Sequence, residues 1–263
     1  MLLFDNQYYI IRKGDFATNA NTKIIYCFFS SILCVDDYIN RNSYDCFFIL
    51  CGSTTIWSCV ELYLHISNTR IIKPMSISFN NSKIQVSTPI GILLRGFQEG
   101  GFITTLGLYY GDRIHEPFYL LHMHIFIILM ITHMFFKSNV SKSSKRQINT
   151  VGSVGYISTV TLYNIHRFFH YPEHQLRQTY MFATMIYICS FWTFFAWLFK
   201  FRQVEVYIKN KFDLIDNTEY PYNIVQKYNI LPATNMETFC VLAYDVIFEI
   251  GFAYVFFYNL FLV

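Results

Sequence analysis

Seven stretches of the sequence are apolar enough to enter a lipid bilayer, and this pattern limits the fold more than any motif does. A membrane-crossing helix needs about 20 mostly apolar residues. Hydrophobic residues make up 54% of the 263 residues and charged residues only 14%, whereas a soluble domain carries about 25% charged residues. We therefore expect an all-α, polytopic membrane bundle of about seven transmembrane helices, forming one domain over residues 1–263. The expected spans cover residues 19–37, 45–66, 89–110, 117–136, 151–169, 178–198 and 237–262.

The loops between these stretches alternate between rich and poor in Lys and Arg. Cytoplasmic loops of membrane proteins carry an excess of these residues. The N-terminal segment and loops 67–88, 137–150 and 199–236 are the rich ones, whereas the opposite loops contain Arg41, Arg113, Arg167 and Arg177. The pattern predicts a cytoplasmic N-terminus. The first stretch is the shortest, with about twelve mostly apolar residues between Ile24 and Val35, but omitting it would place Arg12, Lys13 and Lys23 on the wrong side.

The composition also limits which classes of binding partner we expect for this chain. The formal net charge of +3 provides no basic stripe of the kind that binds nucleic acid. Lys and Arg near the spans suit anionic lipid headgroups. We expect the lipid bilayer itself as a partner, together with other membrane subunits if the chain belongs to a complex. The sequence indicates a multi-pass location without indicating which membrane.

The last span contains two acidic residues in an otherwise apolar run. Asp245 and Glu249 are four residues apart and therefore lie on one helix face. Two carboxylates inside a membrane are costly unless they are protonated, hydrogen-bonded or neutralised. Glu61 and His65 show the same spacing at the cytoplasmic end of the second span, and His133 ends the fourth. We interpret these five residues as candidate acid–base groups or metal ligands, and equally as structural groups with partners on neighbouring helices.

The third span combines charge with closely spaced glycines. Arg95 and Glu99 are four residues apart and could pair with each other or bind a substrate headgroup. Glycines four apart, at 96 and 100 and again at 107 and 111, allow two helix backbones to approach closely in lipid. Tight helix packing is the simplest interpretation of the glycine pattern.

Histidines form a second group near the opposite side of the membrane. His115 and His122 align with His133 along one face of the fourth span, and His166 and His170 share a face at the end of the fifth. Imidazoles facing lipid would be costly, so these should face the bundle interior. His115, His122, His166 and His170 are candidate metal ligands, and a divalent metal or haem is the cofactor that such residues could hold.

No motif names a reaction, so three functional classes stay open. The first is a membrane-embedded enzyme that acts on a lipid or other apolar substrate through a buried His and carboxylate site. The second is a bis-histidine haem electron carrier, with His133 and His65 at an inner haem and His122 with His166 or His170 at an outer one. The third is a non-catalytic scaffold, a subunit of a larger complex such as an organellar respiratory complex, or a transporter. We place the enzyme first.

Overall fold

The computed structural model describes residues 6–13, 19–67, 70–72, 74–79, 82–135, 142–207 and 230–263. Within these residues, each of the seven predicted ranges forms a helix or an unbroken helical run. The predicted end of the fourth range, residue 136, lies outside the described residues. The helical elements are α1 (Ala20–Arg41), α2 (Asp45–Ile66), α3 (Thr88–Gly96) with η2 (Phe97–Phe102) and α4 (Ile103–Gly111), α5 (Pro117–Phe135), α6 (Val151–His170), η3 (Pro172–His174) with α7 (Gln175–Leu198), and α9 (Asn235–Tyr244) with η5 (Asp245–Phe252) and α10 (Ala253–Phe261).

Three of these helical runs are long and apolar enough to cross a membrane. They are Asp45–Ile66, Pro172–Leu198 and Asn235–Phe261, and the apolar part of α5, Pro117–His133, is shorter. Length and composition therefore support membrane crossing for three helices of the described chain and not for all seven. The other helices contain more polar residues, because α1 carries Asp36 and Asp37 and the α3–α4 run carries Arg95 and Glu99.

The expectation of an all-α fold is confirmed only in part: the described chain is mostly helical, but its loops build sheets. Five short strands pair in the order β2-β5-β1-β6-β7, and β3 and β4 form a separate hairpin. Strands of three to seven residues in polar loops give too little periodicity to be recognised singly. The strands are β1 (Gln7–Lys13), β2 (Arg70–Ile72), β3 (Ser76–Phe79), β4 (Ser82–Gln85), β5 (Lys142–Gln147), β6 (Arg202–Tyr207) and β7 (Ile230–Pro232).

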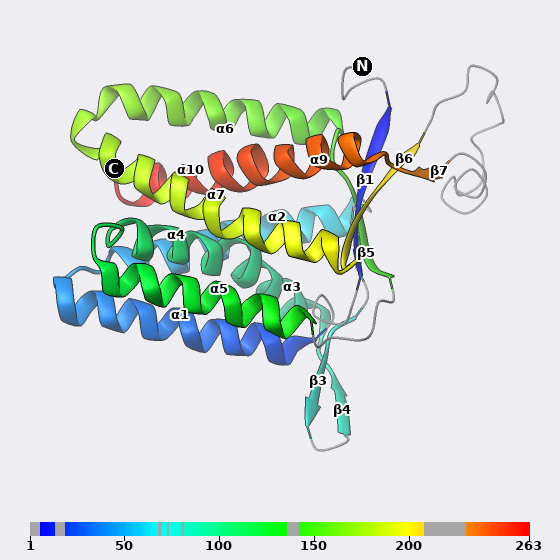
Figure 1. The fold of residues 1–263 in the computed structure, drawn as a ribbon, viewed down its shortest axis with the longest axis horizontal. Helices are drawn as coiled ribbons and strands as arrows, with labels where there is room; N and C mark the ends of the chain where they lie inside the picture. Colours follow the sequence, from blue (N-terminus) through cyan, green and yellow to red (C-terminus); the bar gives the residue numbers. More distant parts are fainter. Residues whose placement is uncertain are drawn as a thin grey trace.

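The five-stranded sheet lies at one end of the helical bundle, with its strands running across the helix axes (Figure 1). All of its strands come from the N-terminal segment and the three Lys/Arg-rich loops. These four segments therefore share one end of the molecule, as the loop-charge pattern predicts. The parts of those loops at 68–69, 73, 80–81, 136–141 and 208–229 lie outside the described residues.

Glycines set the closest helix contacts, as their spacing predicts. A Cβ atom added to Gly100 would lie 2.6 Å from the Cβ of Trp57 on α2, and one added to Gly111 would lie 2.9 Å from the backbone nitrogen of Met181 on α7. The α3–α4 run is thereby held between α2 and α7. It lies in the interior of the bundle, where Phe102, Leu106 and other side chains of this run join the main apolar core.

Candidate functional site

Three arginines project from one face of the sheet. Arg12 on β1 lies directly opposite Arg202 on β6, and Arg146 on β5 lies opposite Ile10, two residues before Arg12. Side chains two residues apart on a strand, and those directly opposite on a neighbouring strand, share a face. Pairing therefore gathers three guanidinium groups from segments nearly 200 residues apart and directs them at the helices.

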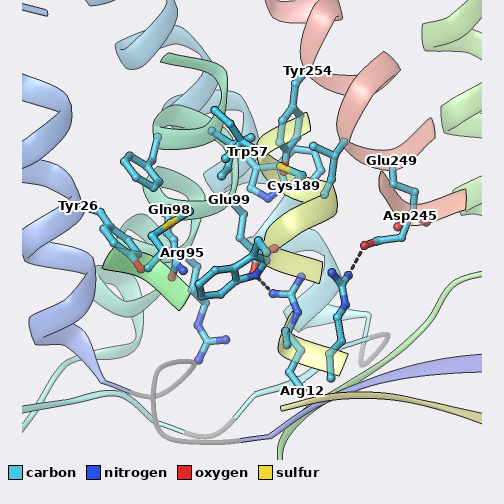
Figure 2. Close-up of a pocket in the computed structure, with 18 of the residues that line it drawn as sticks. Arg12, Tyr26, Trp57, Arg95, Gln98, Glu99, Cys189, Asp245, Glu249 and Tyr254 are labelled. Carbon is cyan, nitrogen blue, oxygen red and sulfur yellow. Dashed lines mark hydrogen bonds and ion pairs between the residues drawn. The ribbon is translucent and has the colours of Figure 1, made fainter. Parts of the chain in front are cut away.

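The helices meet these arginines with carboxylates on two π-helical segments. Glu99 lies in η2, and Asp245 and Glu249 lie in η5. π-Helical turns are rare and are often found at functional sites. Here both interrupt long interior helices at the level of the arginines. Figure 2 shows Glu99 on one helix, Asp245 and Glu249 on another, and Arg12 reaching toward them from the sheet.

The ion pairs join sheet and bundle. Arg146 donates to Asp245 at 2.6 Å and to Glu249 at 2.5 Å, Arg202 also pairs with Asp245, and Arg12 pairs with Glu99. The Asp245 and Glu249 side chains are only 3% and 7% exposed. Charges this deeply buried need such partners, because removal from water costs several kcal/mol per ion.

The ion-pair network shifts the pKa values of Arg146 and Arg202 in opposite directions. Burial lowers the pKa of Arg146, but the charges of Glu249 and Asp245 outweigh burial and hold this pKa above its ordinary value. For Arg202 burial also lowers the pKa, and the attraction of Asp245 only partly compensates, so the pKa lies below its ordinary value. Arg146, which bridges two carboxylates, is therefore the more strongly stabilised cation.

A cavity of about 120 Å³ lies within this network. Among the described residues, five cationic side chains line it (Arg12, Lys23, Arg95, Arg146 and Arg202) against three carboxylates (Glu99, Asp245 and Glu249). The cationic side chains still outnumber the carboxylates, five to four, when the neighbouring Glu61, which is fully buried, is included. The remaining walls are mostly aromatic or apolar, including Tyr26, Trp57, Phe102, Trp192 and Tyr254, with Gln98 as a polar exception. This combination suits an anionic group attached to an apolar body.

No family model, curated protein or solved structure matches this chain. The geometry of the site therefore carries the functional argument.

The structure brings together part of the inner group predicted from the sequence. Asp245 and Glu249, proposed as acid–base groups, line the cavity with Arg95 and Glu99, which were proposed to bind substrate. Glu61 is buried beside it, close enough to influence the charge of Lys23. The other two candidates lie elsewhere: the side chains of His65 and His133 are exposed and do not line the cavity.

The four candidate metal ligands are spread over separate contacts. His115 hydrogen-bonds the Tyr180 hydroxyl at 3.0 Å, and His122 hydrogen-bonds the Tyr110 hydroxyl at 3.1 Å. His166 and His170 stack with ring centroids 5.5 Å apart, and both are exposed. Among the described residues, no group of three or more His, Cys, Asp or Glu side chains is arranged to hold a metal ion. The metal and haem roles therefore stay predictions from the sequence.

Sequence reasoning missed the arginines of the sheet as site residues. Arg12, Arg146 and Arg202 lie in segments that the sequence marks as connections between spans, where a basic residue is ordinary under the positive-inside pattern. A usable signal was nevertheless present. Carboxylates inside a span require cationic partners, and arginines a few residues from the ends of the spans can reach them.

A second charged cluster closes the opposite end of the bundle. Arg113 pairs with Asp37 at 2.8 Å, and Arg177 pairs with Asp112 and Asp45, each at 2.7 Å. Burial raises the pKa of Asp112, but the hydrogen bond and charge of Arg177 outweigh burial and hold it below its ordinary value. These pairs connect the α1–α2 turn, the end of α4 and the start of α7, so we assign this cluster a structural role.

Proposed function

We propose that the chain is a polytopic membrane protein with its sheet on the cytoplasmic side, and that its inner cavity binds the anionic headgroup of a lipid-like molecule. In this proposal all seven helical runs are embedded. The three long apolar runs cross the bilayer, and the more polar ones are accommodated because their polar side chains face the bundle interior.

Helix α1 supports this arrangement because its two faces are the reverse of those of a soluble helix. Its outward face exposes large apolar side chains, with Ile25 63%, Phe28 70% and Ile39 72% exposed. Its inward face buries Lys23 and Asp37. In water, an apolar stripe faces the core and charges face the solvent. An apolar exterior around a charged interior is instead the arrangement that a bilayer favours.

The observation that carries the binding proposal is the composition of the cavity lining, in which five cationic side chains face three carboxylates. Guanidinium groups recognise carboxylates and phosphates with paired, charge-assisted hydrogen bonds. The cavity has room for such a headgroup, and the adjoining aromatic side chains suit the first part of an apolar chain. If the protein is an enzyme, Asp245 and Glu249 are the acid–base groups that such a ligand would meet in the cavity.

Binding of a short-chain anionic lipid by the purified full-length chain tests the proposal. Dioctanoyl phosphatidic acid should bind and dioctanoylglycerol, which lacks the phosphate, should bind at least about tenfold more weakly, because hydrogen bonds to charged groups contribute about 1.5–3 kcal/mol. Arg95→Gln should remove most of this preference. Lys83→Gln, which neutralises an exposed cation on β4, is the matched control and should retain it.

Two results would contradict the proposal. One is equal affinity for the two lipids in the unaltered protein. The other is an Arg95→Gln protein that melts like the unaltered chain and still prefers the phosphatidic acid as strongly as the Lys83→Gln control does.

A further inference from the structure

A second cavity, of about 230 Å³, lies between α6, α7 and the junction of η5 with α10. Figure 1 shows α6 along one side of the bundle beside α7 and α10. The walls of this groove are mostly apolar, and Ile165 and Phe169 on its rim are 44% and 73% exposed. The groove therefore opens toward the surroundings of the bundle. Its lining consists of Asn164, Ile165, Phe168, Phe169, Gln178, Thr179, Phe182, Phe252 and Val255.

One polar group in this lining is unsatisfied. Gln178 is only 2% exposed, and its amide nitrogen has no hydrogen-bond partner among the described residues. By contrast, the amide nitrogen of Asn164 donates to the backbone oxygen of Phe252 at 2.6 Å, and its oxygen accepts from Asn259. An unpaired buried amide is costly. A buried donor in the wall of an apolar groove is the polar feature that orients a ligand.

The depth of Gln178 in the membrane indicates which group of a ligand it would contact. It is the fourth residue of α7, at the end of the bundle opposite the sheet, and Phe182 lies one turn deeper. In the proposed orientation this first turn enters the bilayer from the outer side, at the level where hydrocarbon meets headgroups. Ester carbonyls of glycerolipids lie at that level. Deeper in the groove, the rings of Phe182 and Phe252 pack with centroids 4.9 Å apart and line a path for an acyl chain.

We infer that this groove binds one acyl chain of an outer-leaflet glycerolipid, whose ester carbonyl accepts a hydrogen bond from the Gln178 amide. The inference shares the membrane location with the proposed function but not its ligand or its site. It requires no net charge on the lipid, because the lining contains no ionisable side chain.

The test uses the full-length chain in phosphatidylcholine nanodiscs with a photoreactive phosphatidylcholine whose acyl chain carries a diazirine. Labelling should concentrate on the groove residues of α6 and α7, as read by peptide mass spectrometry. The ester-linked and ether-linked phosphatidylcholines are compared as the bulk lipid of the nanodisc. The ester-linked lipid should compete with the label about 3–10-fold better than the ether-linked lipid, which lacks the carbonyl, because a neutral hydrogen bond contributes about 0.5–1.5 kcal/mol.

Two variants make the test specific. Gln178→Leu should abolish the preference for ester over ether while leaving groove labelling in place, and Gln85→Leu, on the exposed face of β4, is the matched control. Thr179→Phe, at an exposed lining position, should fill the groove and reduce labelling by both lipids, which keeps the inference testable if Gln178→Leu fails to fold.

Three outcomes would overturn the inference. They are labelling spread evenly around the bundle, equal competition by ester and ether lipids in the unaltered chain, and an undiminished preference in Gln178→Leu. Because phosphatidylcholine is zwitterionic and the groove shares no lining residue with the inner cavity, Arg95→Gln should not alter groove labelling. Failure of this inference and failure of the anion-binding proposal therefore give different results.

Discussion

Arg146 is the most informative residue to change, because it joins the sheet to the last helical run. It donates to both Asp245 and Glu249, at 2.6 and 2.5 Å. Arg146→Gln removes this cation and shortens the side chain. Asp245 keeps Arg202 as a partner, so the carboxylate most affected by the substitution is Glu249.

The expected loss of stability in Arg146→Gln follows from the burial of Glu249. The Glu249 side chain is 7% exposed, and removing one partner of a buried ion pair costs about 3–5 kcal/mol because the other charge stays in the interior uncompensated. At about 2–4 °C per kcal/mol for a protein of this size, the melting temperature should fall by roughly 6–20 °C. Adding Glu249→Gln should recover much of this loss, because a neutral side chain no longer needs the cation.

Thermal unfolding in a mild neutral detergent measures both effects. The matched control is Arg41→Gln: Arg41 also contacts two carboxylates, Asp37 and Asp112, but its side chain is 36% exposed. Both carboxylates are buried, but each keeps a second arginine, Arg113 for Asp37 and Arg177 for Asp112. Because solvent also screens the partly exposed Arg41, this control should lose at most a few degrees. The reasoning is refuted if the two single variants melt at the same temperature, or if the double variant is no more stable than Arg146→Gln.

Two further predictions concern the rest of the bundle. Asp112→Asn should destabilise the protein at pH 7. Burial raises the pKa of Asp112, but Arg177 outweighs burial and holds this pKa below its ordinary value of 3.8. The unaltered protein therefore loses this contribution as the pH falls from about 5 through the folded-state pKa, and its melting curves from pH 7 to 3 should converge with those of the variant. Parallel curves would contradict this linkage. Gly111→Ala should cost about 1–3 kcal/mol, because its Cβ would lie 2.9 Å from the Met181 backbone, whereas Gly155→Ala has open space around its Cβ and should stabilise the helix by about 0.5–1 kcal/mol. Equal melting temperatures for the two glycine variants would show that the close helix contact contributes nothing.

The helices were predictable because each depends on a local feature of about 20 residues. Even α1, predicted from a short apolar run, is helical from Ala20 to Arg41. Its polar residues masked the pattern, because they occupy the buried face while the apolar ones are exposed. The sheet was not predictable in the same way. Its β1 strand pairs with β5 and β6, 129 or more residues away, and no local signal in a strand of six or seven residues specifies a partner at that distance.

The site was predictable only for the residues that are anomalous where they lie. Asp245 and Glu249 are carboxylates in an apolar run, so the cost of burying them identified them. His65 and His133 were selected by residue type and helical spacing, neither of which tells which face of a helix is buried. The structure places them on exposed faces outside the cavity. Arg146 is ordinary in a basic loop, and its role arises only when strand pairing turns it toward the helices.

Two roles compete for the charged cavity, and its residues divide between them. Arg146 is matched by Asp245 and Glu249, which is what a structural joint between sheet and helices requires. Arg95 and Lys23 also line the cavity and bring its cationic side chains to five against three carboxylates, a ratio that suits an anionic ligand. If the cavity were only a joint, Arg95→Gln would leave lipid affinity unchanged. If it binds an anionic headgroup, the same substitution weakens binding of the phosphate-bearing lipid while binding of the neutral one is retained. The melting temperature of Arg146→Gln therefore tests the contact between sheet and helices, and the lipid affinity of Arg95→Gln tests the binding of the ligand.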